Sequence, residues 1–195
     1  FPHQPVKPSV KANPLVALIQ SRLGMPLLGG NHLALLSEPE TILDSLITDI
    51  QQAKIFCYLE FYIWQAGGRV DDIAEALMQA AKRGVDCRVL LDSVGSADFF
   101  DTEWSARLRS AGILLVEVLP AKAWRMPFHR QDLRMHRKLM IVDDRVAYTG
   151  SMNLIDPQLF KQNMGVGQWI DVMVRVQGPV VPVMWSLFVR DWEME

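Results

Sequence analysis

The stretch MHRKLMIVDDRVAYTGSMN, residues 135–153, has the pattern of two short strands joined by a tight turn. Residues 139–142 are all apolar, as expected of a strand that is buried on both faces. Asp143 and Asp144 are turn-forming residues, and a second apolar run follows them and leads to Gly150. The pattern therefore predicts strands over residues 134–142 and 145–149, joined like a hairpin at Asp143-Asp144.

Outward from this hairpin, strand-like and helix-like segments alternate along the chain. Apolar and β-branched runs predict further strands over residues 32–36, 54–64, 85–92, 113–119 and 165–178. Apolar residues at the helical period predict helices over residues 15–24, 37–53, 67–84, 101–112 and 179–195. Ser37 and Glu40 have the spacing of a capping box at the start of one of them. This alternation indicates α/β layers, with helices covering a mostly parallel sheet.

The bulk composition is that of an ordinary globular domain. The chain has 195 residues, of which 50% are hydrophobic and 22% charged, with a net charge of −2. That length fits one domain with a sizeable core, and we divide it into a linker with a short helix (residues 1–30) and one folded domain (residues 31–195). A protein that binds nucleic acid through general electrostatics would usually be basic, so a nucleic-acid partner is not expected.

Neither the cysteines nor the termini suggest a metal site or a membrane span. Cys57 and Cys87 each lie in an apolar stretch and are predicted to be buried, reduced thiols in neighbouring strands. The sequence has no Cys/His cluster with metal-ligand spacing, so no metal is expected. No apolar run reaches the roughly 18 residues that a membrane span needs. The proline-rich start has no initiator methionine and is predicted to be a linker, or the cut end of a longer protein.

His136 and Lys138 are the candidate reactive pair. Side chains alternate along a strand, so His136 and Lys138 share one face and Arg137 points to the other. Neutral imidazole can attack phosphorus as a nucleophile, and a neighbouring ammonium stabilises charge on the phosphate oxygens. The pair therefore indicates phosphoryl chemistry.

Further candidates follow the second strand. Gly150 lets the backbone approach a phosphate closely, and the Ser151 hydroxyl and the Asn153 amide can donate to its oxygens. A histidine nucleophile needs one ring nitrogen held, usually by a carboxylate, and Asp171 is the best candidate for that partner. Asp143 is at the bend, where a structural or orienting role fits better than proton transfer.

Purely structural roles remain open for each residue taken alone. An isolated histidine is usually a satisfied core residue, and Lys138 could extend along the surface to reach water. Tyr62 near one strand end, and Asp92 and Ser93 at another, are weaker site candidates, because ligands of α/β sheets bind at strand ends. The apolar face of residues 179–195 could lie on lipid, but such a face is more often core.

Taken together, His136, Lys138, Asp143, Gly150, Ser151 and Asn153 form the HxKxxxxD signature with its trailing Gly-Ser-x-Asn, and the chain resembles the phospholipase D superfamily. The segments EFYIWQAGG, AAKRGVDCRVLLDSVGS, AYTGSMN and GVGQWIDV look like the first catalytic half of bacterial cardiolipin synthases. The resemblance covers about residues 30–195. It implies an α/β/α sandwich with a mixed, mostly parallel central sheet.

The resemblance also implies a two-step phosphatidyl transfer that needs no metal and no cofactor. A histidine would attack phosphatidylglycerol and release glycerol, and a second phosphatidylglycerol would take the phosphatidyl group to give cardiolipin. Carried over by position, His136 is the nucleophile or the general acid/base, and Lys138 and Asn153 hold the phosphate. Ser151 supports the phosphate site, Asp143 completes the catalytic motif, and Asp171 orients His136.

The chain departs from the family in carrying one motif. Family members carry two, and of the four histidines in this chain only His136 has a lysine two residues on. The missing partner would be a second catalytic half or a second copy of the chain. The resemblance further implies an anionic membrane surface as a partner and a parent protein in the bacterial inner membrane, with this chain alone being soluble.

Two other functions stay open. One is a single-motif, homodimeric phosphodiesterase or nuclease, for which a broad basic surface would be expected. The other is a half-domain that binds a lipid headgroup or phosphate without turning it over. The wider resemblance favours phosphatidyl transfer over both.

Overall fold

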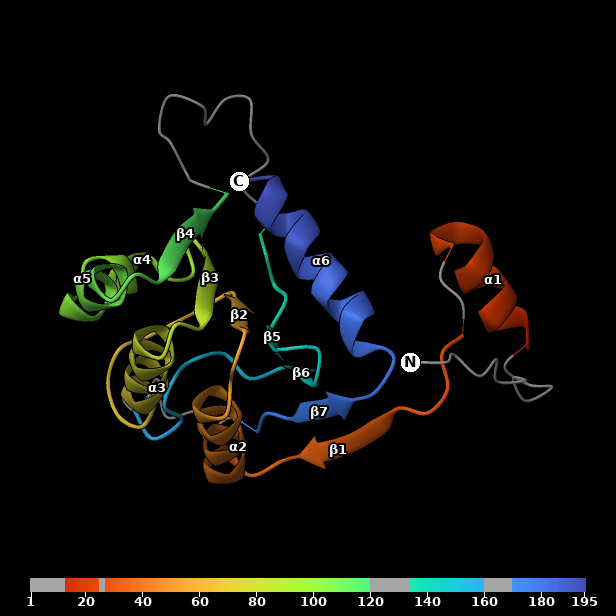
Figure 1. Ribbon diagram of the computed structural model, residues 1–195, viewed down its shortest axis with the longest axis horizontal. Coiled ribbons are helices and arrows are strands. Elements are labelled where there is room, and N and C mark those ends of the chain that lie inside the picture. The colour runs from red at the N-terminus through yellow and green to blue at the C-terminus, as the bar shows by residue number, and fades with distance from the viewer. Residues whose placement is uncertain (1–12, 25–26, 120–133, 160–169) are drawn as a thin grey trace.

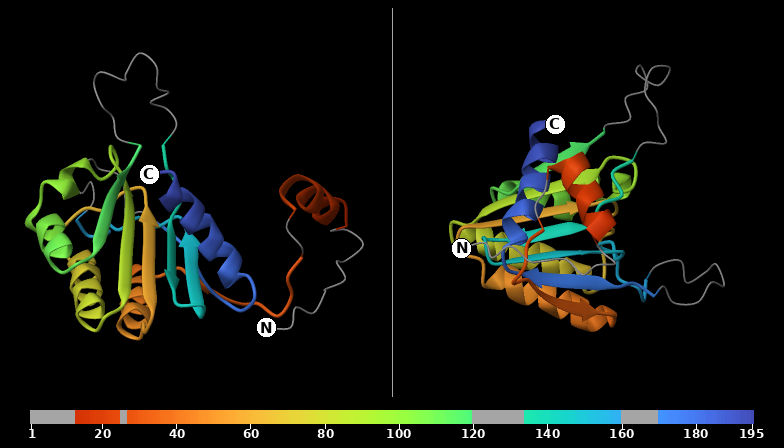
Figure 2. Two further views of the ribbon diagram at one scale, coloured as in Figure 1. Left: turned by 45° about the horizontal axis from the view of Figure 1, so that its top comes forward. Right: turned by 90° about the vertical axis from the view of Figure 1, so that its right-hand side faces the viewer.

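The protein is described by a computed structural model that covers residues 13–24, 27–119, 134–159 and 170–195. These residues form one seven-stranded sheet with helices on both faces (Figures 1 and 2). The strands are β1 (His32–Leu36), β2 (Phe56–Phe61), β3 (Asp86–Asp92), β4 (Leu114–Val118), β5 (Leu139–Val142), β6 (Val146–Gly150) and β7 (Met173–Gln177). The helices are α1 (Asn13–Leu23), α2 (Pro39–Gln51), α3 (Val70–Lys82), α4 (Ala97–Phe100), α5 (Glu103–Ser110) and α6 (Val181–Glu193).

The sheet is mixed, in the order β1-β7-β6-β5-β2-β3-β4. Five strands run in one direction, and β5 and β7 run against them. Only the β2–β3 and β3–β4 pairings are parallel, and the other four are antiparallel. The predicted mixed α/β/α arrangement is confirmed, but its parallel pairing is confined to one side. The reason is that β5 and β6 are joined by a hairpin, which forces antiparallel neighbours.

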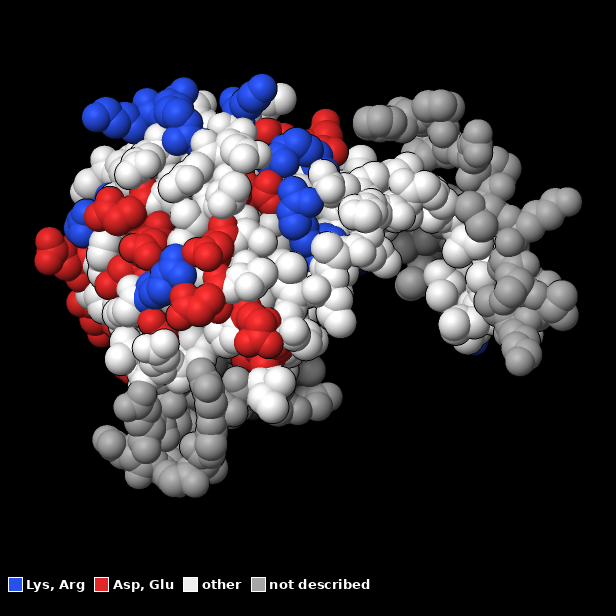
Figure 3. Space-filling model, turned by 90° about the horizontal axis from the view of Figure 1, so that it is seen from below, with Lys and Arg blue, Asp and Glu red and all other residues white. Residues whose placement is uncertain are grey.

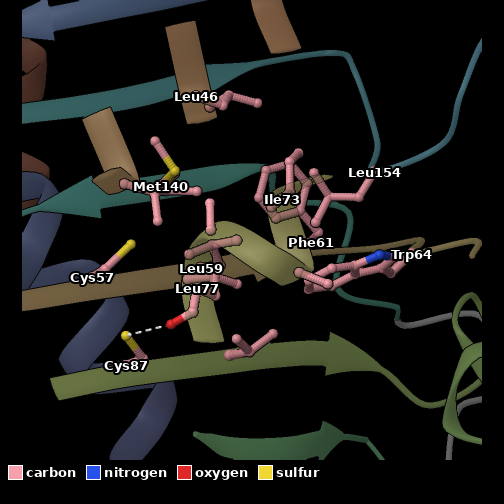
Figure 4. Packing of buried hydrophobic residues seen from close by; sticks show 14 of the residues in the cluster. Leu46, Cys57, Leu59, Phe61, Trp64, Ile73, Leu77, Cys87, Met140 and Leu154 are labelled. Carbon is pink, nitrogen blue, oxygen red and sulfur yellow. Dashed lines mark hydrogen bonds between the residues drawn. The ribbon is translucent and has the colours of Figure 1, made fainter. Parts of the chain in front are cut away.

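The larger core lies between the sheet and helices α2, α3 and α5. Buried apolar side chains of β2 and β5 alternate toward this face, where they meet those of α2 and α3. Figure 4 shows this packing, including Met140 of β5 and Ile73 and Leu77 of α3. Cys57 and Cys87 are register partners in the adjacent strands β2 and β3 and are buried free thiols, as predicted.

The second core lies on the other face, under α6. Its buried members include Tyr58 and Leu90 from the central strands, Leu139 and Ile141 from β5, and Phe188 from α6. Tyr58 and Phe188 stack with ring centroids 4.8 Å apart. The right-hand view of Figure 2 shows α6 on the side of the sheet away from α2 and α3. The apolar face of α6 is therefore core, and α1 lies away from the sheet (Figure 1).

Most predicted elements are present, with changes at their ends. The strand predicted to begin at residue 134 joins the ladder only at Leu139, and the one predicted over residues 165–178 is a strand over Met173–Gln177. Residues 160–169 lie outside the described residues. The short helix α4 is not predicted by the sequence pattern. The division of the chain at residue 30 stays a prediction.

In the part of the chain that the structure describes, no helix is long and apolar enough to cross a membrane. The face seen in Figure 3 carries several acidic side chains close together and scattered groups of basic ones. Within its described atoms, this face has no continuous basic surface.

Candidate active site

One edge of the sheet collects the segments that carry the predicted site residues. The register sets the end of β2 beside the start of β5 (Glu60 with Leu139), and the end of β6 beside both β5 and β7. Residues 62–64, 92–96, 134–138, 150–153 and 171–172 therefore all border this edge, which we call the site edge. Strand ends are rigid supports, so groups placed here keep their geometry.

His136 and Lys138 lie together at the site edge, where both contact one aromatic ring. The exposed His136 ring packs edge-on against Tyr62, with ring centroids 4.5 Å apart and planes at 85°. The Lys138 ammonium lies 5.5 Å from the centroid of the same Tyr62 ring. It also donates a hydrogen bond of 2.7 Å to the carbonyl oxygen of His136. Tyr62, a weak candidate from the sequence, thus contacts both members of the pair.

The electrostatic setting of Lys138 suits a phosphate ligand. Its pKa is lowered because partial burial disfavours the charged ammonium, although the nearby Asp171 carboxylate acts in the opposite direction. An ammonium that is short of water gains more from a bound anion than a fully solvated one does. The partly buried Lys138 ammonium can therefore interact strongly with an anion.

Asp92 anchors the segment that precedes β5. Its buried carboxylate accepts hydrogen bonds from the Arg134 guanidinium at 2.6 and 3.1 Å and from the Met135 backbone N–H at 3.1 Å. The Ser93 hydroxyl accepts a further hydrogen bond of 3.0 Å from Arg134. Asp92 and Ser93 thus border the site edge as predicted, and there they hold the chain that leads to His136.

Ser151 and Asp171 form a hydrogen-bonded pair at the ends of β6 and β7. The Ser151 hydroxyl donates to the Asp171 carboxylate at 2.6 Å and accepts from the Val172 backbone N–H at 3.0 Å. The expected contact of Asp171 with His136 is absent among the described residues, where the carboxylate is bonded to Ser151 instead. Asp171 remains close enough to Lys138 to affect its pKa.

Gly150 is required by the close approach of two strands. A Cβ atom placed on Gly150 would lie 2.2 Å from the Val172 carbonyl oxygen and 2.7 Å from the Met173 sulfur. Any side chain would push β7 away from β6 and separate Ser151 from Asp171. The sequence pattern assigns this glycine to phosphate approach, whereas the structure gives it a packing reason.

Asn153 is fixed through its oxygen. Its side-chain Oδ1 accepts a hydrogen bond of 3.1 Å from the Ile63 backbone N–H. The neighbouring Leu154 extends the contact, since its N–H donates to the Ile63 carbonyl at 3.0 Å. The side-chain oxygen is thus used in a hydrogen bond within the protein, and the side-chain NH₂ group can donate to a ligand.

Asp143 is not brought to the site. It follows β5 at the edge opposite to His136, with a positive φ of 51°. Its buried carboxylate accepts hydrogen bonds from the backbone N–H groups of Ile55 at 2.9 Å, Phe56 at 3.0 Å and Lys54 at 3.2 Å. Asp143 therefore holds the start of β2, which is the structural role that its place at the bend favours.

Two charged groups behind the site were missed from the sequence. The Glu60 carboxylate is fully buried on the α6 face of β2, where it forms an ion pair with Arg137 at 2.9 Å. A lone acid in the apolar run FCYLEFY was the available signal, but its partner is 77 residues away. No group of three or more potential metal ligands occurs within the described ranges.

Comparison with known proteins places this site in a family. Residues 46–192 match the family described as "Cardiolipin synthase, PLD-like domain". The chain is 50% identical over 184 residues to proteins named cardiolipin synthase A from Erwinia tasmaniensis and from Yersinia pseudotuberculosis. Each alignment covers 94% of this chain and 38% of the relative, so the chain spans little more than a third of their length.

Solved structures support the same fold. NucT from Helicobacter pylori matches with a TM-score of 0.58 at 19% identity, over 84% of this chain and 95% of that one. Nuc from Salmonella typhimurium, described as a phospholipase D family member, matches with a TM-score of 0.58 at 21% identity, over 84% and 93%. The family match covers most of the sequence and includes the whole site edge, and the chain therefore belongs to the PLD-like domain family of the cardiolipin synthases.

Proposed function

We propose that this chain supplies one half of a phosphatidyl-transfer site, with His136 forming a covalent phosphohistidine intermediate. The observation that carries the proposal is the shared position of the exposed His136 imidazole and the Lys138 ammonium around Tyr62. Relatives at 50% identity are named cardiolipin synthase A, so the proposed donor and acceptor are both phosphatidylglycerol.

In the first step, a His136 ring nitrogen attacks the phosphorus of phosphatidylglycerol. The bond from phosphorus to the glycerol headgroup oxygen breaks, and glycerol leaves after taking a proton from a general acid. Lys138 and the Asn153 NH₂ group stabilise the charge that develops on the non-bridging oxygens. Ser151 and Asp171 hold the β6–β7 end of the site through their hydrogen bond.

In the second step, a hydroxyl of another phosphatidylglycerol attacks the same phosphorus. The bond from phosphorus to His136 breaks, the general base takes the hydroxyl proton, and cardiolipin is released. The acid and base are one group used in both directions. We assign it to a second histidine outside this chain, on the remainder of a longer protein or on a second copy. The proposed partners are thus that second motif and an anionic lipid surface.

The test is turnover of phosphatidylglycerol in mixed micelles, with a search for a phosphatidyl adduct on His136 by mass spectrometry. The parent chain should form the adduct or release glycerol, and His136→Ala should do neither. Lys138→Ala should reduce the rate by about a hundredfold, because it removes the main charge on the phosphate oxygens. His32→Ala is the matched control, since this exposed histidine lies on β1 away from the site edge.

Other outcomes identify the rival functions. Neither adduct nor glycerol from the folded chain alone, with both appearing once a second motif is supplied, points to a half-site whose second histidine is missing. Cleavage of DNA that depends on His136 would replace the proposal with a phosphodiesterase. The third outcome is that the chain binds lipid through Lys138 but gives neither adduct nor turnover, even when a second motif is supplied. The chain would then be a domain that binds a lipid headgroup without reacting with it.

A further inference from the structure

Arg137 lies between His136 and Lys138 in sequence but on the other face of the sheet. Its neighbours Met135 and Leu139 also pack on that face, against the core under α6. The guanidinium is ion-paired to Glu60 of β2 at 2.9 Å and to Asp191 of α6. The residue between the two site residues is therefore bonded to two other elements.

Segment 134–138 needs such bonds, because it lies outside the β-ladder. The pairing of β5 with its neighbours in the sheet begins only at Leu139. Asp92 holds the start of the segment through Arg134 and Met135. Arg137 attaches the segment between the two site residues, and Glu60 is its fully buried partner.

Glu60 is an unusual residue for a buried strand, and it lies near the end of β2. Its Oε1 atom accepts from Arg137, while its Oε2 atom is buried with no hydrogen-bond partner in the described part of the chain. Burial raises the pKa of this carboxyl to about 7, although Arg137 and Arg190 favour the charged form. The carboxylate and the carboxylic acid are thus both populated near neutral pH.

The surroundings of Glu60 contain few other charges. From α6, Asp191 and Arg190 face this region, and they also pair with each other at 3.5 Å. The register neighbours of Glu60 are apolar, namely Leu90 on β3 and Leu139 on β5. Arg88, on the same face, is held by Asp86 and lies over the rings of Tyr58 and Trp192.

We propose that Glu60 is a positioning residue of the phosphatidyl-transfer site: its carboxylate holds Arg137 from behind the sheet and so fixes the spacing of His136 and Lys138. The ionised pair holds the segment firmly. Protonation of Glu60 weakens the pair, leaves Arg137 to Asp191 alone, and loosens the segment. The site is then best ordered on the alkaline side of neutrality. This role rests on the proposed function, but its structural part can be measured without turnover.

The first experiment follows the positions of the site residues by NMR in the whole chain, labelled with ¹³C in its glutamate carboxyl and lysine ε-carbon atoms. A His136→Asn background removes the imidazole next to Lys138. One carboxyl signal should titrate near pH 7 and be absent in Glu60→Gln. The chemical shift of the Lys138 ε-carbon should change over the same pH range, and this change should also be absent in Glu60→Gln.

The matched control is Asp49→Asn, which breaks another buried carboxylate–arginine cluster, on the opposite face of the sheet. It should retain the Lys138 step near pH 7. A Lys138 signal that stays flat while Glu60 titrates would overturn the proposal. So would an equal loss of the step in Asp49→Asn, because the effect would then be general loosening.

The second experiment measures turnover with the complementary motif supplied, at pH values from 5.5 to 8.5. Glu60→Gln resembles the protonated state at every pH. Its kcat should match the parent's below pH 6 and be about tenfold lower above pH 8, since small misplacements of reacting groups are costly. A ratio independent of pH would contradict the positioning role. Absence of turnover in the parent would count against the proposed function and leave the NMR result standing.

Discussion

Within the HxKxxxxD signature, individual residues have separate tasks. His136 and Lys138 lie at the site edge around Tyr62, while Asp143 lies at the opposite edge and binds three backbone N–H groups of the segment that starts β2. The spacing of the signature therefore spans one whole strand: its first two residues precede β5 and its last follows it. Asp143 secures the strand whose other end carries the reactive pair.

Asp143→Ala should destabilise the fold while leaving the site chemistry in place. The backbone N–H donors of the exposed Lys54 and Ile55 and of the half-buried Phe56 would lose their buried acceptor, and the new residue would have to keep a positive φ. We expect the free energy of unfolding, measured by urea titration, to fall by about 3 kcal/mol. Adduct formation at His136 in the folded fraction should be unchanged.

The adjacent Asp144 provides the control for that experiment. Its side chain is exposed at the same bend, so Asp144→Ala should change the free energy of unfolding by less than about 0.5 kcal/mol. If Asp143→Ala abolished adduct formation in fully folded protein, Asp143 would have to act on the site across the length of β5.

At the scale of single side chains, the sequence predicts what local periodicity determines. Alternation correctly separated His136 and Lys138 from Arg137. It could not supply Glu60 as the partner of Arg137, or Ser151 as the partner of Asp171, because these pairs are 77 and 20 residues apart, beyond the range of local periodicity. The contact expected between Asp171 and His136 is not formed among the described residues, where Asp171 accepts a hydrogen bond from Ser151.

At the scale of elements, helix ends were easier to predict than helix starts. Gly84 and Gly112 follow α3 and α5 with φ of 91° and 86°, which is the conformation that ends helices. The capping box expected at Ser37 is not formed, since Pro39 starts α2 and Glu38 is its N-cap residue. Glu40 is used instead in an ion pair with Arg69, which joins α2 to the start of α3.

A buried charge cluster joins α2 to strands β6 and β7. The Asp49 carboxylate, 3% exposed, is ion-paired to Arg175 at 2.7 Å and Arg145 at 3.0 Å and accepts a hydrogen bond from Tyr148. Burial acts to raise the pKa of Asp49, but the bonds from Arg175, Tyr148 and Arg145 outweigh it, so the pKa lies below its usual 3.8.

This cluster predicts a defined loss of stability in acid. A carboxyl whose pKa is lower in the folded state stabilises the protein above its unfolded pKa, and that contribution is lost as the pH falls through the folded value. The urea midpoint should therefore drop on acidification below about pH 4. Asp49→Asn should lower the free energy of unfolding by about 2–4 kcal/mol at pH 7 and should remove that acid-dependent step. If Asp49→Asn lost stability in acid just as the parent does, the loss would have to come from other carboxyl groups.

At the scale of the whole molecule, the layers could be predicted and the strand order could not. Alternating helices and strands indicate a sheet covered on both faces. The insertion of β5 beside β2 depends on pairings across about 80 residues. The return of β1 to the outermost position of the sheet, beside β7, depends on pairings across about 140 residues. The antiparallel majority among the pairings follows from that order.

Both cores share this one sheet, so the domain should unfold as a unit. Phe188 of α6 is fully buried in the core between α6 and the sheet, on the face opposite α2 and α3. Phe188→Ala should lower the free energy of unfolding by about 3–5 kcal/mol. Far-UV and near-UV circular dichroism should report one coincident transition in the parent and in the variant. Two separated transitions in the variant would mean that α6 unfolds independently of the other layer.

The burial of both cysteines makes the chain suitable for selective thiol labelling. Cys57 and Cys87 are 0% and 3% exposed, and burial raises the pKa of both thiols, that of Cys87 to about 12. A maleimide reacts with exposed thiolate, so neither residue should take it up in the native protein. Ser110 is exposed at the end of α5, just ahead of the turn that leads into β4 and hence at the edge away from His136. A cysteine placed there by Ser110→Cys would give one attachment point for a dye or a surface, with the reactive edge directed toward a lipid bilayer presented from solution.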